Sequence, residues 1–140
     1  MAFSFFDHTG DIGIHLSANS AEGLFASAAE ALAETLVDSG TVVPRNGEAV
    51  HVAADELDIL MVEWLSELLY RFEGHNMLPR TADVTLTRRA ASHVLTATVR
   101  GEPFDPARHT IKVLVKGITY HALEVRETAE GWRATVVLDI

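Results

Sequence analysis

Two stretches of the 140-residue chain repeat apolar residues every three or four positions, and the sequence after them repeats apolar residues every second position. The first spacing occupies residues 20–36 and 55–72, and the second begins near Leu78. Intervals of three and four gather apolar side chains on one face of an α-helix, whereas an interval of two gathers them on one face of a strand. The chain must therefore bury two helix faces against a sheet.

The first helix follows a half-buried strand expected at residues 11–18. Either Asn19 or Ser20 can cap the helix, and Gly40 lies just beyond its end. The expected apolar stripe consists of Leu24, Phe25, Ala28, Ala29, Leu32 and Leu36. This pattern is typical of an amphipathic helix packed against a core.

The second helix follows a break at residues 44–47 and a short strand expected at residues 48–53. We expect Asp55 to cap it. Trp64 and Phe72 are expected to pack in the core rather than to form a platform for a ligand. The whole stripe consists of Leu57, Leu60, Met61, Trp64, Leu65, Leu68, Leu69 and Phe72.

The last part of the sequence predicts strands joined by short connections, which favours an antiparallel meander. The fold class is therefore α+β: a two-layer sandwich with a mostly antiparallel sheet and two amphipathic helices packed on one face. We expect one domain over residues 1–140, because no repeat or linker interrupts the chain. The strand-like segments are ADVTLTRR, HVLTATVRG, TIKVLVKG, TYHALEVRE and WRATVVLDI.

The composition and the missing motifs exclude several kinds of site and of partner. The chain has no cysteine, which excludes disulfides and thiolate metal ligands, and its net charge of −9 disfavours unaided binding to a nucleic-acid backbone. The sequence shows no signal peptide and no apolar run long enough to span a bilayer, so we expect a cytoplasmic protein without membrane contact. Neither a glycine-rich phosphate loop nor a standard hydrolase motif is present.

The end of the sequence carries the strongest candidate for a site. The predicted strand WRATVVLDI places the Asp139 side chain and the backbone carboxylate of Ile140 one residue apart. Asp11, at the start of the first expected strand, is the candidate third carboxylate of an oxygen site for Ca²⁺ or Mg²⁺. Other polar residues can have purely structural roles instead of taking part in a site. Asp7 can cap a turn, Asp105 can start a turn, and Tyr120 can place its hydroxyl in water.

Several motifs together resemble the archease family over essentially the whole chain. They are DHTGDIGI, SAEGLFASAAEALAETL, LDILMVEWLSELLY, RGEPFDPARH, VKGITYHALEV and the terminal LDI. The resemblance implies a small α+β protein that serves as a cofactor of an RtcB-type RNA ligase in tRNA splicing and RNA repair. Such a protein promotes guanylylation and repeated turnover of the ligase and meets RNA only through it.

The resemblance also implies a metal site formed by Asp11, Asp139 and the backbone carboxylate of Ile140. We expect Ca²⁺ there, with Mg²⁺ or Mn²⁺ as alternatives. We expect Asp7 and His8 to shape or extend this site from behind the ligands. The resemblance itself assigns no role to six polar residues near the motifs, which are Asp7, His8, Asp105, His109, Lys116 and His121.

Two other functions remain open at this point. One is a stand-alone metal-dependent phosphoesterase, in which Asp11 and Asp139 hold the ion and His121 or His109 acts as general base. The other is a chaperone-like protein-binding domain whose terminal acids are only solvated.

Overall fold

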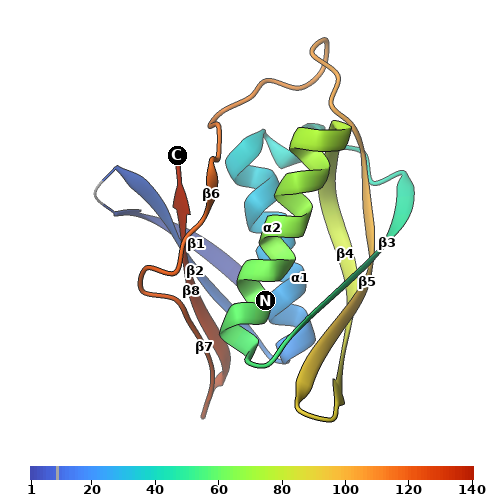
Figure 1. The fold of residues 1–140 in the computed structure, drawn as a ribbon. Coiled ribbons are helices and arrows are strands. Elements are labelled where there is room, and N and C mark those ends of the chain that lie inside the picture. Colours follow the sequence, from blue (N-terminus) through green and yellow to red (C-terminus); the bar gives the residue numbers. More distant parts are fainter. Residues whose placement is uncertain (9) are drawn as a thin grey trace.

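The structure is a computed structural model that describes residues 1–8 and 10–140, with the side chains of His8 and Asn46 excluded. Two antiparallel sheets enclose two helices between them (Figure 1). The larger sheet has the order β1-β2-β8-β6 with β7 also pairing with β8, and the smaller has the order β3-β5-β4. The elements are β1 (Ala2–His8), β2 (Asp11–Ala18), α1 (Ala21–Leu36), the 3₁₀ helix η1 (Ser39–Thr41), β3 (Asn46–Ala54), α2 (Leu57–His75), β4 (Met77–Arg89), β5 (Ser92–Pro103), β6 (Gly117–Ile118), β7 (Glu124–Thr128) and β8 (Gly131–Asp139).

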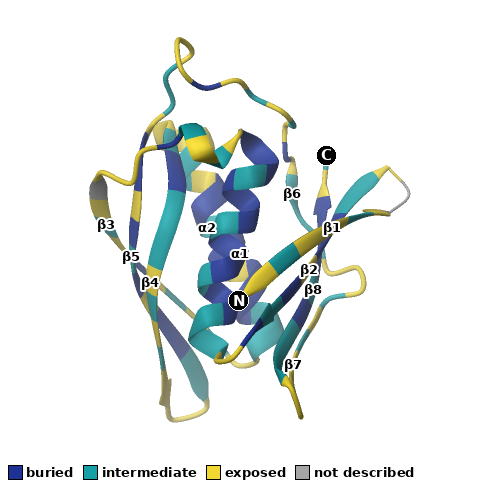
Figure 2. Cartoon of the chain, turned by 180° about the vertical axis from the view of Figure 1, so that it is seen from behind, coloured by how far each residue is buried: buried dark blue, intermediate teal, exposed yellow. Residues whose placement is uncertain are grey.

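The expected α+β class and antiparallel pairing are confirmed, but the strands divide between two sheets instead of forming one. The segment 104–116, here called the crossover, leads the chain from β5 in the smaller sheet to β6 in the larger one (Figure 1). Each helix can therefore bury side chains toward both sheets. Helix α1 contacts β2 of the larger sheet and β4 of the smaller one, and none of its residues is exposed (Figure 2).

The strand expected at TIKVLVKG is wrong except at its end, because only Gly117 and Ile118 pair with β8. The rest of the segment bonds to other elements: the Lys112 amide donates to the Leu36 carbonyl at 2.8 Å. Its alternation reflects one buried side, on which Ile111 and Val115 pack against the core, and an exposed side that includes Leu114. Alternation requires only an extended chain with one buried side, so it does not by itself indicate a ladder.

Helix α1 begins as predicted. Ser20 is the cap, with its hydroxyl accepting a hydrogen bond from the Gly23 amide at 3.0 Å. All six residues of the expected stripe are buried, and the buried surface extends further around the helix to include Ala31 and Ala33. The helix is thus covered on more sides than an amphipathic helix on a single sheet would be.

Helix α2 begins at Leu57 with Glu56 at the cap position, so the prediction that Asp55 caps it is wrong. The Asp55 carboxylate instead accepts a hydrogen bond from the Ser92 hydroxyl at the start of β5, at 3.4 Å. Trp64 is fully buried, as predicted, and its indole N–H donates to the Phe25 carbonyl of α1 at 2.8 Å. Neither helix in the described chain is long and apolar enough to cross a membrane.

Strand β1 was not expected from the sequence. Its seven residues pair with β2 from Ala2 opposite Ser17 to His8 opposite Asp11. The Phe6 ring stacks on the His15 ring with centroids 4.4 Å apart and covers Gly13, where an added Cβ would collide with the ring. The small glycine therefore lets this aromatic pair close over the strand.

Replacing Trp64 by alanine should lower the free energy of unfolding by about 3 to 5 kcal/mol, because it opens a cavity and removes the bond to Phe25. Tyr70→Ala provides the control on the same helix, since that side chain is 58% exposed. The control should change stability by less than about 0.5 kcal/mol. Urea unfolding of the three proteins measures both effects, and equal midpoints for the two variants would contradict this account of the core.

Candidate metal centre

The pairing of β2 with β8 brings the first and last parts of the chain together. Ile12 lies opposite Leu138, and continuing this antiparallel register by one residue sets Asp11 opposite Asp139. Side chains directly opposite each other in an antiparallel pair have Cβ atoms about 4.5 to 5.5 Å apart. The two carboxylates predicted from the sequence are thus neighbours at one end of the larger sheet.

Strand alternation also fixes the face on which these carboxylates lie. Asp11 shares its face with Gly13 and His15, and Asp139 shares its face with Thr135, whose hydroxyl is 3.3 Å from His15 Nδ1. This is the outer face of the sheet, away from the helices. The intervening residues Ile14 and Val136 are buried in the core.

The neighbour of Asp139 on the β6 side is a glycine. Asp139 lies opposite Gly117 on its other side, and a Cβ built on Gly117 would meet no heavy atom within 4 Å. Two carboxylates on neighbouring strands are oxygen donors of the kind that a hard cation such as Ca²⁺ prefers. The described residues contain no group of three or more His, Cys, Asp or Glu side chains that could hold a metal ion.

The end of β8 is held by backbone hydrogen bonds on the side of β6. The Lys116 amide donates to the Asp139 carbonyl at 2.7 Å, and the amide and hydroxyl of Thr119 both donate to the Val137 carbonyl, at 3.0 and 2.9 Å. Chain ends usually fray without such contacts. These bonds keep Asp139 in register, and Ile140, which follows it, packs partly buried against the core.

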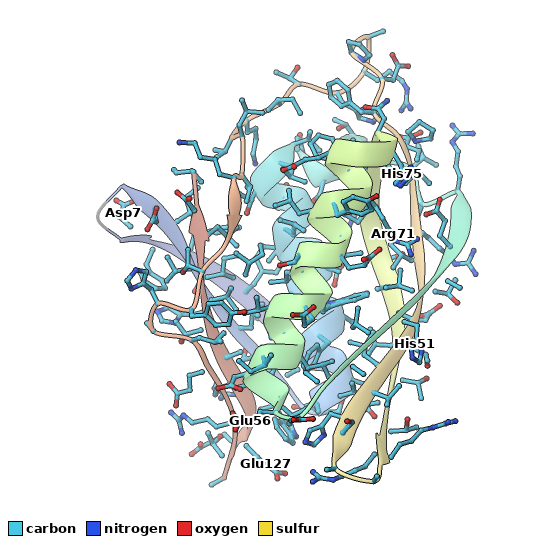
Figure 3. All side chains as sticks on the ribbon, in the orientation of Figure 1. Asp7, His51, Glu56, Arg71, His75 and Glu127 are labelled. Carbon is cyan, nitrogen blue, oxygen red and sulfur yellow. The ribbon has the colours of Figure 1, made fainter. Side chains whose placement is uncertain are left out.

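The other polar residues near the motifs separate into different environments. Asp7 lies opposite Ile12 and therefore on the inner face of the β1–β2 hairpin, away from Asp11 (Figure 3 labels Asp7). Tyr120 is 61% exposed, in agreement with a hydroxyl in water, and His121 is also exposed. Thr9 and the side chain of His8, both within the DHTGDIGI motif, lie outside the described residues.

A polar cluster lies where the crossover leaves β5, within the motif RGEPFDPARH; its acidic and histidine residues could be chosen from the sequence, but their burial and their partners could not. Glu102 is 2% exposed, and its carboxylate accepts hydrogen bonds from the Arg108 guanidinium and from the Val43 amide, the latter at 2.8 Å. His109 Nε2 lies 3.0 Å from the same carboxylate. The Arg108 guanidinium, together with the Val43 and His109 hydrogen bonds, outweighs burial and lowers the pKa of Glu102 to about 2.

His109 has no free nitrogen in this arrangement. Its Nδ1 accepts the Asp105 amide at 2.9 Å, so Nε2 carries the proton that faces Glu102. The side chain is also buried. His109 is therefore a structural residue, and this geometry does not suit the general base considered above. Asp105 does start a turn, as predicted, by accepting the Ala107 amide at 2.9 Å.

The fold and site define a small α+β protein with helices between antiparallel sheets and an acidic pair at the end of the central strands. The solution structure of Methanobacterium thermoautotrophicum protein 1598 matches it with a TM-score of 0.84 and 27% identity, covering 99% of this chain and 98% of that one. The profile of the archease protein family matches residues 3–140. The chain belongs to the archease family.

Curated relatives agree with this assignment. Protein archease of Methanosarcina acetivorans is 33% identical over 139 residues, which cover 99% of this chain and 95% of the relative. Protein archease of Pyrococcus abyssi is 32% identical over 136 residues, covering 96% of each. These names describe a protein and not an enzymatic activity, and membership of the family supports a role as a protein cofactor in RNA ligation.

Glu102→Gln should lower the free energy of unfolding at pH 7 by about 2 kcal/mol, because a charged hydrogen-bond acceptor is lost in a buried place. The ordinary pKa of 4.5 falls to about 2 in the folded protein, so the contribution of Glu102 is present above about pH 4.5 and is lost as the pH falls toward 2. Urea unfolding across this pH range measures the loss.

Glu48→Gln is the matched control, because the Glu48 side chain is 41% exposed and forms a surface ion pair with Arg71 at 3.1 Å. Its effect should stay below about 1 kcal/mol. If Glu102→Gln and Glu48→Gln were equally stable at pH 7, the buried cluster would not contribute as described.

Proposed function

We propose that this archease is a metal-binding, non-catalytic activator of an RtcB-type RNA ligase. It acts in tRNA splicing and RNA repair by promoting guanylylation and multiple turnover of the ligase. The observation that carries the proposal is the register of β2 and β8, in which Ile12 pairs with Leu138, so that the next residues in line are Asp11 and Asp139. The ligase holds the RNA, in keeping with the net charge of −9 on this chain.

In this proposal Asp11, Asp139 and the backbone carboxylate of Ile140 hold the ion. Ca²⁺ is favoured because all three groups offer anionic oxygen, with Mg²⁺ and Mn²⁺ as alternatives. A bound divalent ion supplies positive charge that can stabilise anionic phosphate groups. The contribution of this chain is to hold the two carboxylates in one register at the end of a fixed strand pair, where a partner can reach them.

The geometry favours an activator over a stand-alone phosphoesterase. That alternative needs a general base near the acids, and one of its two candidates, His109, has both ring nitrogens engaged and is buried. Purified protein tested alone on phosphate esters and on RNA ends should therefore show no hydrolysis or ligation. Hydrolysis that is lost in Asp11→Asn would replace the activator function with an enzymatic one.

Asp11→Asn and Asp139→Asn should each weaken Ca²⁺ binding and the acceleration of ligase guanylylation by about tenfold or more, because each removes an anionic ligand while keeping the side-chain shape. Calorimetric titration of Ca²⁺ and single-turnover guanylylation of an RtcB-type ligase measure the two effects.

Asp83→Asn is the control for these variants, since this exposed aspartate lies on β4 in the other sheet. It should bind Ca²⁺ and activate like the unchanged protein. Normal activation by either Asp11→Asn or Asp139→Asn would rule out the proposed site. If all four proteins bound a client protein but none altered ligation, the chaperone-like function would replace this one.

Extending the chain by two glycines after Ile140 should weaken Ca²⁺ binding and activation, because a neutral amide replaces the carboxylate while the Asp139 side chain remains. The same two glycines placed before Met1 form the control and should have no effect. Equal Ca²⁺ affinities for the two extended proteins, measured by calorimetry, would show that the Ile140 carboxylate is not a ligand.

A further inference from the structure

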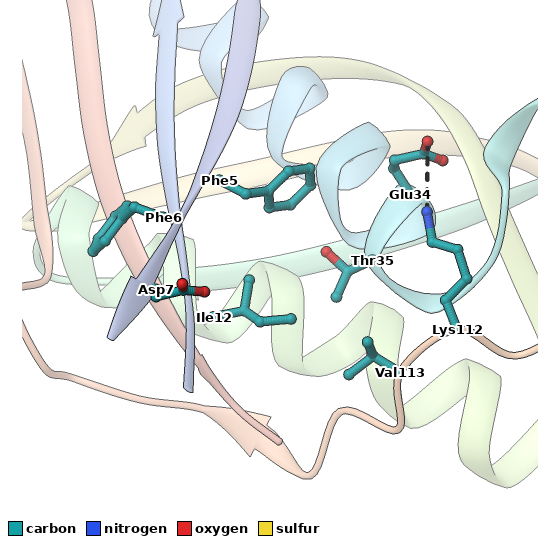
Figure 4. A pocket seen from close by; sticks show the side chains of 8 residues that line it. All are labelled: Phe5, Phe6, Asp7, Ile12, Glu34, Thr35, Lys112 and Val113. Atoms are coloured by element: carbon teal, nitrogen blue, oxygen red, sulfur yellow. Dashed lines mark ion pairs between the residues drawn. The ribbon is translucent and has the colours of Figure 1, made fainter. Parts of the chain in front are cut away.

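A pocket of about 330 Å³ lies on the inner side of the β1–β2 hairpin, opposite the acidic pair. The hairpin, the last turns of α1 and the crossover line this open pocket, and Figure 4 shows their side chains around it. Phe5, Ile12 and Val113 form its apolar walls. Phe5 is 44% exposed although it is a large apolar side chain, so its ring is available to a partner.

The charged groups lie at opposite ends of this pocket. Figure 4 shows Asp7 at one end and the Glu34–Lys112 ion pair at the other, with the apolar side chains between them. Lys112 Nζ lies 3.6 Å from Glu34 Oε1, and the Ser39 amide donates a hydrogen bond to Glu34 Oε2 at 2.8 Å. The positive charge of Lys112 is thus balanced by the carboxylate of Glu34.

Asp7 differs from Lys112 because no ion pair to it occurs among the described residues. With two carboxylates and one ammonium group, the pocket carries a net negative charge on a protein that is itself strongly acidic. An anionic ligand such as a nucleotide is disfavoured by this charge. The pocket instead complements a side chain with an apolar stem and a cationic head.

We propose that this pocket receives an arginine side chain of the partner ligase, an inference that rests on the proposed function. The arginine stem covers Ile12 and Val113, the planar guanidinium stacks on the exposed Phe5 ring, and its N–H groups donate to the Asp7 carboxylate. Lysine fits less well, because its ammonium group cannot make a bidentate bond to a carboxylate.

In this proposal the inner and outer faces of the β1–β2 hairpin have different functions. Asp7 lies opposite Ile12 in the ladder and contributes to the inner pocket, whereas Asp11 lies opposite Asp139 at the end of the outer face. The inner face binds the partner, and the outer face presents the ion. Variants at Asp7 and Asp11 should therefore affect different steps.

A direct test uses the blocked tripeptide Gly-Arg-Gly, titrated into ¹⁵N-labelled protein and followed by NMR. The amides of Phe5, Asp7 and Val113 should shift, with a Kd on the order of millimolar, as expected for one small side chain. The same peptide with citrulline has nearly the same shape but no charge and should cause no comparable shifts. Asp7→Asn should abolish the response, whereas Asp83→Asn should retain it.

The second arm measures the affinity of the full-length protein for an RtcB-type ligase. Phe5→Ala and Asp7→Asn should each weaken binding about tenfold, through the loss of ring stacking or of a charged contact. Leu114→Ser is the matched control, because Leu114 is 71% exposed on the crossover but does not line the pocket. Asp11→Asn should still bind the ligase while failing to activate it.

Equal responses to the arginine and citrulline peptides would overturn the pocket's preference for arginine. Unchanged ligase affinity in both Phe5→Ala and Asp7→Asn would overturn the assignment of its occupant to the ligase. If the unchanged protein bound no ligase at all, the proposed function and the ligase's part in this inference would both fail, while the peptide titration would still decide whether the pocket takes arginine.

Discussion

The burial of α1 between two sheets is the constraint on which the rest of the structure depends. Ten of its sixteen residues are buried, and four of these are alanines that let neighbouring backbones approach closely. The two polar residues among the ten are satisfied without water: Ser27 donates to the Ala2 carbonyl of β1, and Thr35 donates to the Ala31 carbonyl one turn earlier. The helix therefore also fixes the position of β1.

The end of α1 fixes the crossover in turn. The Leu36 carbonyl accepts the Lys112 amide, and Glu34 pairs with the Lys112 side chain. At its other end the crossover is bound to β8 through Lys116 and Asp139, and the buried carboxylate of Glu102 secures its start. The proposed metal ligands thus depend on polar contacts that lie well outside the site.

The sequence predicted the elements whose patterns reflect burial in a simple way. Helix α1, strand β2 and the buried Trp64 follow from spacing and side-chain type alone, and Ser20 was one of two candidates for the helix cap. Strand β1 did not follow, because Phe5 and Phe6 are adjacent, lie on opposite faces and are both partly exposed. The Asp55 cap failed because Ser92, distant in sequence, engages its carboxylate.

The candidate site, too, could be predicted from the sequence only in part. Asp11 and Asp139 could be chosen from residue type and resemblance, but their apposition comes from the β2–β8 register, which no local pattern contains. The burial of Glu102 did not follow from the sequence, because glutamate is typically found on a surface. Its burial becomes favourable only once Arg108 and the Val43 amide meet it in the folded loop.

The pairing of β2 with β8 has a consequence for biosynthesis. The ribosome releases β2 first, and two helices and five strands follow before its central partner β8. Until then one edge of β2 lacks its neighbour, and Asp11 has no Asp139 beside it. A nascent chain or one truncated before β8 therefore cannot bring the two carboxylates together, so the proposed metal site can form only after the larger sheet has closed.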